Sequence, residues 1–301
     1  MKIAFCFAGQ GAQYIGMGKD FYENLDLVKK IYDAFPEIKD LCFNENELLN
    51  QTAYAQKAML LTSFAIAKSL EEKGIVPEFA CGLSLGEYSA LAFANAWKIE
   101  DAIEIISNRG RIMQNALPLG TTKMAAIIGL DRNTILETLK KVDTGVVEIA
   151  NYNCPGQIVI TGTNEAVDKA CELLLEAKAR RAIPLNVSGA FHSSLLNNAS
   201  IELKEVLDRF VPSTPTYRIV YNVSGKEETR PLNDILKDQI CHSVYFEDSV
   251  KYLLEQGVDT FVEIGPGKTL TGFIRKISPT ATIYNVSDYN GYLDIVSKLG
   301  K

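Results

Sequence analysis

The stretch that decides the fold is Phe79-Ala80-Cys81-Gly82-Leu83-Ser84-Leu85-Gly86-Glu87-Tyr88. A short apolar run precedes its glycines and a small-residue segment follows them, which predicts a strand, a sharp turn and a helix. The turn fits the pattern G-x-S-x-G, in which a serine hydroxyl is exposed on a tight turn and can act as a nucleophile. Glycine suits both ends of such a turn because a side chain would crowd the reversing chain. An ordinary strand-to-helix turn remains the alternative, since glycine and serine are common in turns.

The composition indicates a globular protein of one or two domains. The chain has 301 residues and a net charge of −6, which argues against general affinity for nucleic acids. Its six cysteines contain no C-x-x-C pair, as is typical of free thiols in a reducing compartment. No apolar run approaches the roughly 18 residues that span a bilayer, and the N-terminus lacks a signal-peptide pattern. We therefore expect a cytoplasmic protein that is not bound to a membrane.

Two glycine-rich loops follow predicted strands. The first, Ala8-Gly9-Gln10-Gly11-Ala12-Gln13-Tyr14, cannot be a dinucleotide-binding loop, because that pattern requires glycine where Tyr14 stands. Its glycines would let backbone N–H groups approach a ligand, and a mobile connector is the alternative. The second, Gly265-Pro266-Gly267-Lys268-Thr269, lacks the first glycine of a phosphate-binding loop, at the place of Val262. We expect it to be a plain strand-to-helix turn.

Amphipathic helices are predicted at residues 54–73 and 99–117. Arg109 falls on the apolar stripe of the second helix, among Ala102, Ile106 and Met113. An arginine there is costly unless its charge meets an anion or a partner. An anion-binding site, a buried salt bridge and a side chain that reaches water all remain open.

The middle of the chain predicts a ferredoxin-like module, because its elements follow the order βαββαβ. The expected strands are 123–130, 146–151, 157–161 and 181–185, and the expected helices are 133–142 and 165–177. This small domain, residues 122–188, is inserted into a larger α/β domain, residues 1–121 and 189–301. Strands expected at residues 218–222, 260–264 and 282–286 return the chain to the parallel sheet of that larger domain.

A serine nucleophile needs a base and an oxyanion hole. The chain has two histidines, which nearly excludes zinc held by several histidines. His192 is favoured as the base, since it follows Ser84 in a loop between a strand and a helix; His242 would be a helix cap or a surface residue. The oxyanion donors would be the N–H of Leu85 and one from the first glycine-rich loop, for which Gln10 is preferred. No acidic residue is positioned as a third member, so we expect a dyad.

Five motifs of the chain, and the order in which they occur, resemble those of the malonyl-CoA:acyl carrier protein transacylases. The resemblance covers essentially the whole chain. The motifs are Gly9-Gln10-Gly11-Ala12-Gln13, Gly82-Leu83-Ser84-Leu85-Gly86-Glu87-Tyr88, Arg109-Gly110, Gly189-Ala190-Phe191-His192-Ser193 and Val262-Glu263-Ile264-Gly265-Pro266-Gly267. The resemblance implies an α/β-hydrolase-like large domain with a parallel sheet, a ferredoxin-like insert and an active site in the cleft between them.

The resemblance also implies a role for each site residue. Ser84 would be the nucleophile, His192 its base, and Gln10 and Leu85 the oxyanion donors. Arg109 would bind the free carboxylate of malonate, for which the planar guanidinium fork is suited. The implied reaction moves malonyl from coenzyme A to the phosphopantetheine thiol of acyl carrier protein through a malonyl ester on Ser84, for fatty acid biosynthesis, in a monomer without metal or redox cofactor.

Other functions are compatible with the same residues. A discrete acyltransferase of a polyketide assembly line would use the same chemistry with another carrier. A thioesterase or esterase would pass the acyl group to water, and a silent carrier-docking module would perform no chemistry.

The chain departs from the family pattern at two places. Leu83 stands where many members have histidine, so that position is not essential to proton transfer. Tyr245 stands where we align a glutamine whose backbone carbonyl orients the catalytic histidine. Lys178, Arg180 and Arg181 cluster where the small domain ends, and we expect them to dock the acidic carrier near the cleft. A solvated run of cations at a helix end is the alternative.

Overall fold

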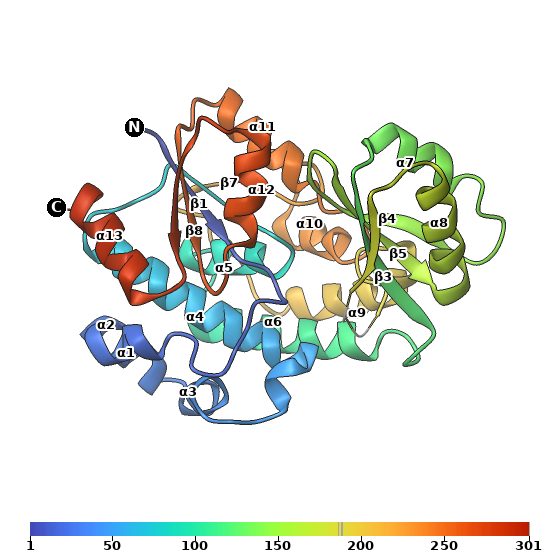
Figure 1. Cartoon of the computed structure of the whole chain (residues 1–301). Helices are drawn as coiled ribbons and strands as arrows, with labels where there is room; N and C mark the ends of the chain where they lie inside the picture. Colours follow the sequence, from blue (N-terminus) through green and yellow to red (C-terminus); the bar gives the residue numbers. More distant parts are fainter. Residues whose placement is uncertain (186, 188, 301) are drawn as a thin grey trace.

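The computed structural model describes residues 1–185, 187 and 189–300, and within them the strands form two sheets (Figure 1). The larger sheet is parallel, in the order β7-β2-β1-β8-β9. Its strands are β1 (Ile3–Phe7), β2 (Phe79–Gly82), β7 (Arg218–Ile219), β8 (Thr260–Ile264) and β9 (Thr282–Val286). The strands expected in this sheet are therefore confirmed, although β7 is shorter than predicted.

Both faces of the parallel sheet are buried, as the alternation along β1 illustrates. Phe5 and Phe7 pack in the core that includes α4 (Thr52–Glu72), α5 (Leu85–Phe93) and α6 (Ile99–Asn115). Ala4 and Cys6 face the opposite side, where α11 (Phe246–Glu255) and α12 (Thr269–Ile277) contribute the core. A strand covered on both sides needs apolar residues at successive positions, which is why the central strand β1, Ile-Ala-Phe-Cys-Phe, is apolar throughout.

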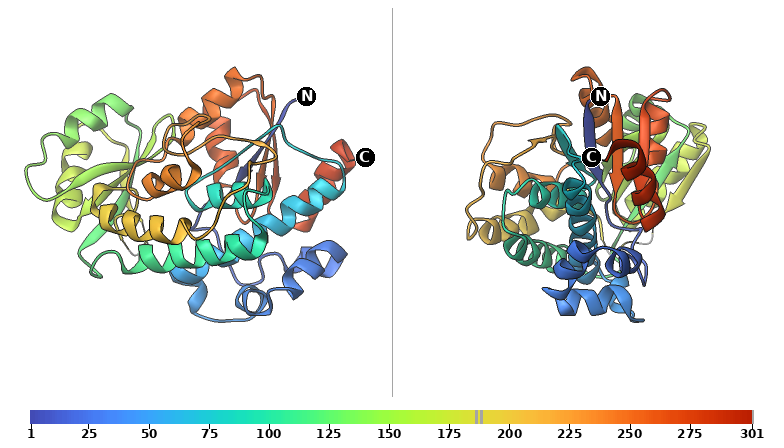
Figure 2. Two further views of the ribbon diagram at one scale, coloured as in Figure 1. Left: turned by 180° about the vertical axis from the view of Figure 1, so that it is seen from behind. Right: turned by 90° about the vertical axis from the view of Figure 1, so that its left-hand side faces the viewer.

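The remaining helices extend these layers. Both views of Figure 2 place the first helices, drawn in blue, on the side of α4 that faces away from the parallel sheet. These and the other helices of the large unit are α1 (Lys19–Asn24), α2 (Asp26–Asp33), α3 (Pro36–Phe43), η1 (Leu48–Asn50), η2 (Ser194–Leu196), α9 (Asn197–Leu207), α10 (Leu232–Gln239) and α13 (Tyr289–Leu299).

The smaller sheet is antiparallel, in the order β4-β5-β3-β6. Its unit runs β3 (Thr122–Ile128), α7 (Arg132–Leu139), β4 (Val147–Cys154), β5 (Gln157–Thr163), α8 (Asn164–Glu176) and β6 (Arg181–Pro184), which confirms the βαββαβ order. It lies beside the large unit in Figure 1. The domain boundaries stay a prediction, and residue 188, where one of them falls, lies outside the described residues.

The two units are joined through main-chain hydrogen bonds at the edge strand β4. The N–H of Tyr152 donates to the carbonyl of Val244 at 2.8 Å, and the N–H of Val244 donates to the carbonyl of Ala150 at 2.8 Å. The segment that precedes α11 therefore runs along β4 and fixes the small sheet next to the carboxyl ends of the parallel strands, where ligands of open α/β sheets bind. Within the described residues, no helix has the length and apolar character needed to cross a membrane.

Candidate active site

The predicted sharp turn connects β2 to α5 and places Ser84 in an unusual backbone conformation. Its φ of 54° and ψ of −105° lie in a region that L-residues rarely occupy, at a cost of ~1–3 kcal/mol. Neither flanking glycine can carry a side chain. A Cβ on Gly82 would lie 2.0 Å from the carbonyl carbon of Gly86, and a Cβ on Gly86 would lie 2.1 Å from the carbonyl oxygen of Phe7. The G-x-S-x-G segment is therefore an elbow held close under β1, not an ordinary turn.

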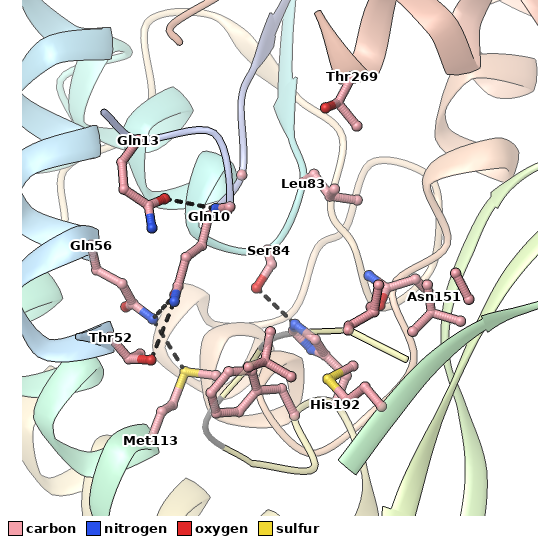
Figure 3. Close-up of a pocket in the computed structure, with 18 of the residues that line it drawn as sticks. Gln10, Gln13, Thr52, Gln56, Leu83, Ser84, Met113, Asn151, His192 and Thr269 are labelled. Atoms are coloured by element: carbon pink, nitrogen blue, oxygen red, sulfur yellow. Dashed lines mark hydrogen bonds between the residues drawn. The ribbon is translucent and has the colours of Figure 1, made fainter. Parts of the chain in front are cut away.

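The Ser84 hydroxyl and the His192 imidazole face each other in Figure 3. Ser84 Oγ lies 2.7 Å from His192 Nε2, and His192 Nδ1 lies 2.8 Å from the backbone carbonyl of Gln239. Because a carbonyl can only accept, Nδ1 carries the hydrogen, which leaves Nε2 free to accept the proton of the serine. The structure thus brings the predicted pair together as a dyad that a main-chain carbonyl orients.

The expectation that Tyr245 supplies this carbonyl is wrong. Tyr245 is the residue before α11, so its carbonyl accepts from the N–H and the hydroxyl of Ser249, each at 2.9 Å. Its ring stacks on Tyr152 of the small unit, with centroids 4.9 Å apart. The carbonyl that orients His192 comes from Gln239, at the end of α10. Nothing in the periodicity of the sequence sets the distance between a histidine and a carbonyl contributed by another element.

His192 is buried, and its environment keeps the imidazole neutral. Burial and the positive charge of Arg109 lower its pKa from 6.5 to about 4. A neutral imidazole is the form that accepts a proton, so His192 is in the form a base requires at neutral pH. His242, by contrast, is exposed, and its Nδ1 lies 2.9 Å from the carbonyl of Asp238. That is the helix-end position expected for it.

Arg109 is fully buried, which excludes the alternative of a side chain that reaches water. Its guanidinium donates to uncharged groups: Gln56 Oε1 at 2.8 Å, Gln239 Oε1 at 2.9 Å and Ser84 Oγ at 3.1 Å. No salt bridge to it forms within the described residues. Gly110 lets α6 approach α4 at this point, since a Cβ there would lie 2.9 Å from Thr52 O. The result is a buried cation in direct contact with the serine.

The carboxyl of Glu87, in the first turn of α5, is also buried near this cation. Burial raises its pKa to about 8, against the opposing effects of the Asn222 N–H and the charge of Arg109. At neutral pH this carboxyl is therefore mostly protonated and does not neutralise Arg109. The positive charge at Ser84 remains available to an anionic group.

Of the two residues proposed as oxyanion donors, Leu85 follows Ser84 in the chain and Gln10 lines the same cavity as Ser84. Leu85 is the first residue of α5, where the N–H has no acceptor within the helix. The loop that carries Gln10 packs on the elbow, because a Cβ on Gly9 would lie 2.7 Å from the carbonyl of Leu83. The Gln10 side chain is anchored by Thr52 Oγ1 at 3.2 Å and by Gln56 Nε2 at 3.3 Å (Figure 3). The use of the two N–H groups as an oxyanion hole stays a prediction.

Ser84 and His192 line a cavity of about 700 Å³ between the two units. One wall comes from loops of the large unit, including Gln10 and Leu83, and from Thr269 on α12. The opposite wall comes from the small sheet, with Asn151 on β4 visible across the cavity in Figure 3. Arg109 is not among the residues that line the cavity in the described part of the chain, but its partners Ser84 and Gln56 are. The cavity is large enough for an extended organic chain.

A known family and several known proteins match this chain over most of its length. The family described as acyl transferase domain matches residues 4–285. A protein from Bacillus subtilis (strain 168) named malonyl CoA-acyl carrier protein transacylase is 43% identical over 297 residues, which is 95% of this chain and 94% of that protein. The chain belongs to the acyl transferase family.

Solved structures of similar chains share the whole fold of this acyltransferase. A malonyl CoA-acyl carrier protein transacylase from Clostridium perfringens has a TM-score of 0.96 and 39% identity, covering 99% of this chain and 97% of that chain. A malonyl-transacylase in complex with a type II polyketide synthase acyl-carrier protein has a TM-score of 0.94 and 35% identity, covering 99% of both chains. The predicted fold class, an α/β protein with a parallel sheet and a separate antiparallel sheet, is confirmed.

In the basic cluster of the acyltransferase, Lys178 and Arg180 lie between α8 and β6, and Arg181 is the first residue of β6. Lys178, Arg180 and Arg181 are exposed. Arg181 pairs with Ile128 of β3, and Ile128 pairs in turn with Gln157, which lines the cavity. The cluster therefore lies within two strands of the cavity wall, and docking of a carrier there stays a prediction.

Sequence reasoning missed three residues that contact the site. Gln239 bonds Arg109 and also donates from Nε2 to the carbonyl of Ser84 at 2.9 Å. Gln56 bonds Arg109, and Asn222 Oδ1 accepts from the N–H of Ser84 at 2.7 Å. A signal existed for Gln239, because it shares the apolar face of α10 with Ile235 and Leu236. It is the same signal that singled out Arg109.

Proposed function

We propose that this acyltransferase moves malonyl from malonyl-CoA to the phosphopantetheine thiol of an acyl carrier protein. One observation carries the proposal: Ser84 Oγ lies between a neutral histidine, 2.7 Å away, and a buried arginine, 3.1 Å away. The first group activates the hydroxyl, and the second selects an acyl group that bears a negative charge. The names of the relatives support the same substrate and carrier.

In the first half-reaction Ser84 becomes acylated. As Oγ attacks the thioester carbon, its proton passes to His192 Nε2, and the carbonyl oxygen becomes an oxyanion that the N–H groups of Gln10 and Leu85 stabilise. When the C–S bond breaks, the imidazolium returns the proton to the sulfur, so that CoA-SH leaves. Ser84 then holds malonyl as an ester, and His192 is neutral again.

The second half-reaction reverses these roles with a new thiol. His192 takes the proton of the carrier's phosphopantetheine thiol, and the sulfur attacks the ester carbon. The C–O bond to Ser84 breaks, and the imidazolium gives its proton to Oγ. The thioester is already activated, so the proposed course needs no metal or redox cofactor.

The malonyl carboxylate would replace the Ser84 hydroxyl as a partner of Arg109. Two parallel N–H donors can bind both carboxylate oxygens, which a lysine cannot do. Arg109→Ala should therefore reduce transfer from malonyl-CoA while sparing transfer from acetyl-CoA. Equal losses with both substrates would make Arg109 a structural residue.

We place the reaction in the cytoplasm, in a monomer that supplies malonyl for fatty acid synthesis, with Lys178, Arg180 and Arg181 in contact with the acidic carrier. Charge reversal at Lys178 and Arg181 should lower kcat/KM for the carrier and leave transfer to free pantetheine unchanged. A polyketide carrier is a second candidate, favoured by the similarity to a transacylase solved with such a carrier. Comparing carriers of the two kinds as acceptors decides between the pathways.

The decisive experiment is intact-mass analysis after incubation with malonyl-CoA. The wild-type protein should gain one malonyl group, and Ser84→Ala should gain none while keeping its thermal unfolding transition. Addition of a carrier protein should move the group to the carrier rather than release malonate. Release to water would identify a thioesterase, and a mass that never changes would indicate a docking module.

A further inference from the structure

The backbone of Ser84 is held on both sides by groups that contact no substrate in the proposed reaction. Its N–H donates to Asn222 Oδ1 at 2.7 Å, and its carbonyl accepts from Gln239 Nε2 at 2.9 Å. The same Asn222 side chain donates from Nδ2 to the carbonyl of Gly82 at 2.6 Å. A single amide therefore bridges the last residue of β2 and the serine, across the turn where φ is positive.

Asn222 is itself fixed by main-chain contacts. Its N–H donates to Glu87 Oε2 at 2.5 Å, and its carbonyl accepts from the N–H of Tyr245 at 2.8 Å. Glu87 belongs to the first turn of the helix that Ser84 precedes. The contacts close a ring from Gly82 to Ser84, along α5 to Glu87 and back through Asn222. Both Asn222 and Glu87 are buried, at 1% and 0% exposure, so water does not compete for these bonds.

We infer that Asn222 and Glu87 are positioning residues that hold the strained Ser84 turn, so that Oγ points at His192; this inference rests on the proposed function of Ser84. An L-residue at positive φ relaxes toward ordinary angles unless its surroundings prevent it. Relaxation would turn Oγ away from Nε2 and tilt the N–H of Leu85. Asn222 resists this because its side chain bonds both Gly82 and Ser84. Glu87 fixes the position of Asn222 relative to α5 by accepting from its N–H.

The test measures the rate of Ser84 malonylation by rapid-quench intact-mass analysis. Asn222→Ala should lower the maximal rate about 10²-fold, the cost of a small misplacement of reacting groups, while the apparent KM for malonyl-CoA stays within about twofold. Glu87→Ala should lower the rate less. Glu87→Gln should recover most of that loss, because its carbonyl oxygen can still accept from the Asn222 N–H.

Asn285 offers a matched control for stability. From β9, its Nδ2 donates to the carbonyl of Gly267 at 2.8 Å and to Glu263 Oε2 at 3.1 Å. Asn285 thereby bridges the end of β8 and the turn that leads to α12. Asn285→Ala should lower the melting temperature about as much as Asn222→Ala and leave the malonylation rate unchanged. A purely structural role of Asn222 would give the two variants the same rates, which would overturn the inference.

The remaining outcomes are separable. If Asn222→Ala does not fold, equal rates for Glu87→Ala and Glu87→Gln would overturn the inference, and rescue by glutamine would support it. If the wild-type protein takes up no malonyl group, the proposed function fails. Labelling of Ser84 by a fluorophosphonate probe then replaces malonylation as the readout. Slower labelling of Asn222→Ala than of Asn285→Ala would still support positioning, and equal labelling would contradict it.

Discussion

The turn between β2 and α5 and the turn between β8 and α12 are built from the same parts, on either side of β1. Each combines glycines with a buried glutamate and a bridging asparagine. In the β8 turn the positive φ angles fall on glycines, 109° at Gly265 and 89° at Gly267. In the β2 turn a positive φ falls on Ser84. One turn is relaxed, and the other is strained at the residue that we propose reacts.

The two glutamates differ in the same way. Glu263 accepts from the N–H groups of Leu270 and Thr271, at 2.9 and 2.8 Å, and from Asn285, so both of its oxygens are bonded. Glu87 accepts from Asn222 through one oxygen, and in the described part of the chain its Oε1 has no partner. The carboxylate of Glu263 therefore stabilises the start of α12 with all of its oxygens bonded, whereas the carboxyl of Glu87, beside Arg109, has one oxygen without a hydrogen bond. Such local departures from the stable solution are typical of functional sites.

The largest effect should come from the histidine that faces the strained turn. His192→Ala should lower the rate of Ser84 acylation by about two to four powers of ten, the usual range for a general base. Pre-steady-state release of CoA measures this rate. His242→Ala should change it little, because His242 is exposed and bonds a helix carbonyl. Equal losses in the two variants would contradict the assignment of the base.

A methyl group on Gly82 should break the strained turn. Its Cβ would lie 2.0 Å from the backbone of Gly86, which no side-chain rotation can relieve. We expect Gly82→Ala to reduce the free energy of unfolding by about 3 kcal/mol or more, as severe overpacking does. Urea denaturation measures the loss. A normal unfolding free energy would mean that the elbow can open without cost.

Amide substitution should separate the two glutamates. In Glu263→Gln, the new NH₂ group would face a backbone N–H of Leu270 or Thr271, and two donors cannot bond each other. The substitution should therefore lower the free energy of unfolding by about 1–3 kcal/mol. Glu87→Gln can keep its oxygen on the Asn222 N–H and place the NH₂ where no partner is displaced, so it should cost less. Urea unfolding of both variants at pH 6 tests the ordering, and the reverse order would contradict the comparison.

The pH dependence of Glu87→Gln gives an independent check. The pKa of Glu87 is about 8 in the folded protein and ordinarily 4.5. Between these values the unfolded chain has lost the proton and the folded protein keeps it, so the wild-type protein loses stability as pH rises from about 5 to 8. Glu87→Gln should lose less over this window. Parallel curves for the two proteins would show that Glu87 is ionised when folded.

The smallest effect should be a gain in stability from a substitution in α12, the helix that follows the relaxed β8 turn. Gly272 lies within α12 and is exposed, and a Cβ there would meet nothing within 4 Å. Gly272→Ala should therefore raise the free energy of unfolding by about 0.5–1 kcal/mol, because alanine loses less backbone entropy in a helix. Urea denaturation measures the gain. A lower free energy of unfolding would contradict the prediction, because it would mean that the added methyl group clashes with a neighbour.

Local sequence patterns determined the elements and the principal pair of side chains. The elbow glycines, the apolar strands and the helical stripe of α6 are repeated or short-range signals, so each could be read without the rest of the fold. For the same reason Ser84, Arg109 and the βαββαβ order could be predicted. His192 could be selected because the chain offers a single alternative, His242.

Only the tertiary structure decided how these groups are held. The carbonyl that orients His192 belongs to Gln239 and not to Tyr245, and the bond that fixes Ser84 comes from Asn222. Both contacts join elements more than one strand or helix apart in the chain, and a main-chain carbonyl leaves no mark on residue type. The burial that lowers the pKa of His192 and raises that of Glu87 is likewise a property of the packed core. The sequence identifies the reacting groups, but their protonation and orientation depend on contacts between segments that are distant in the chain.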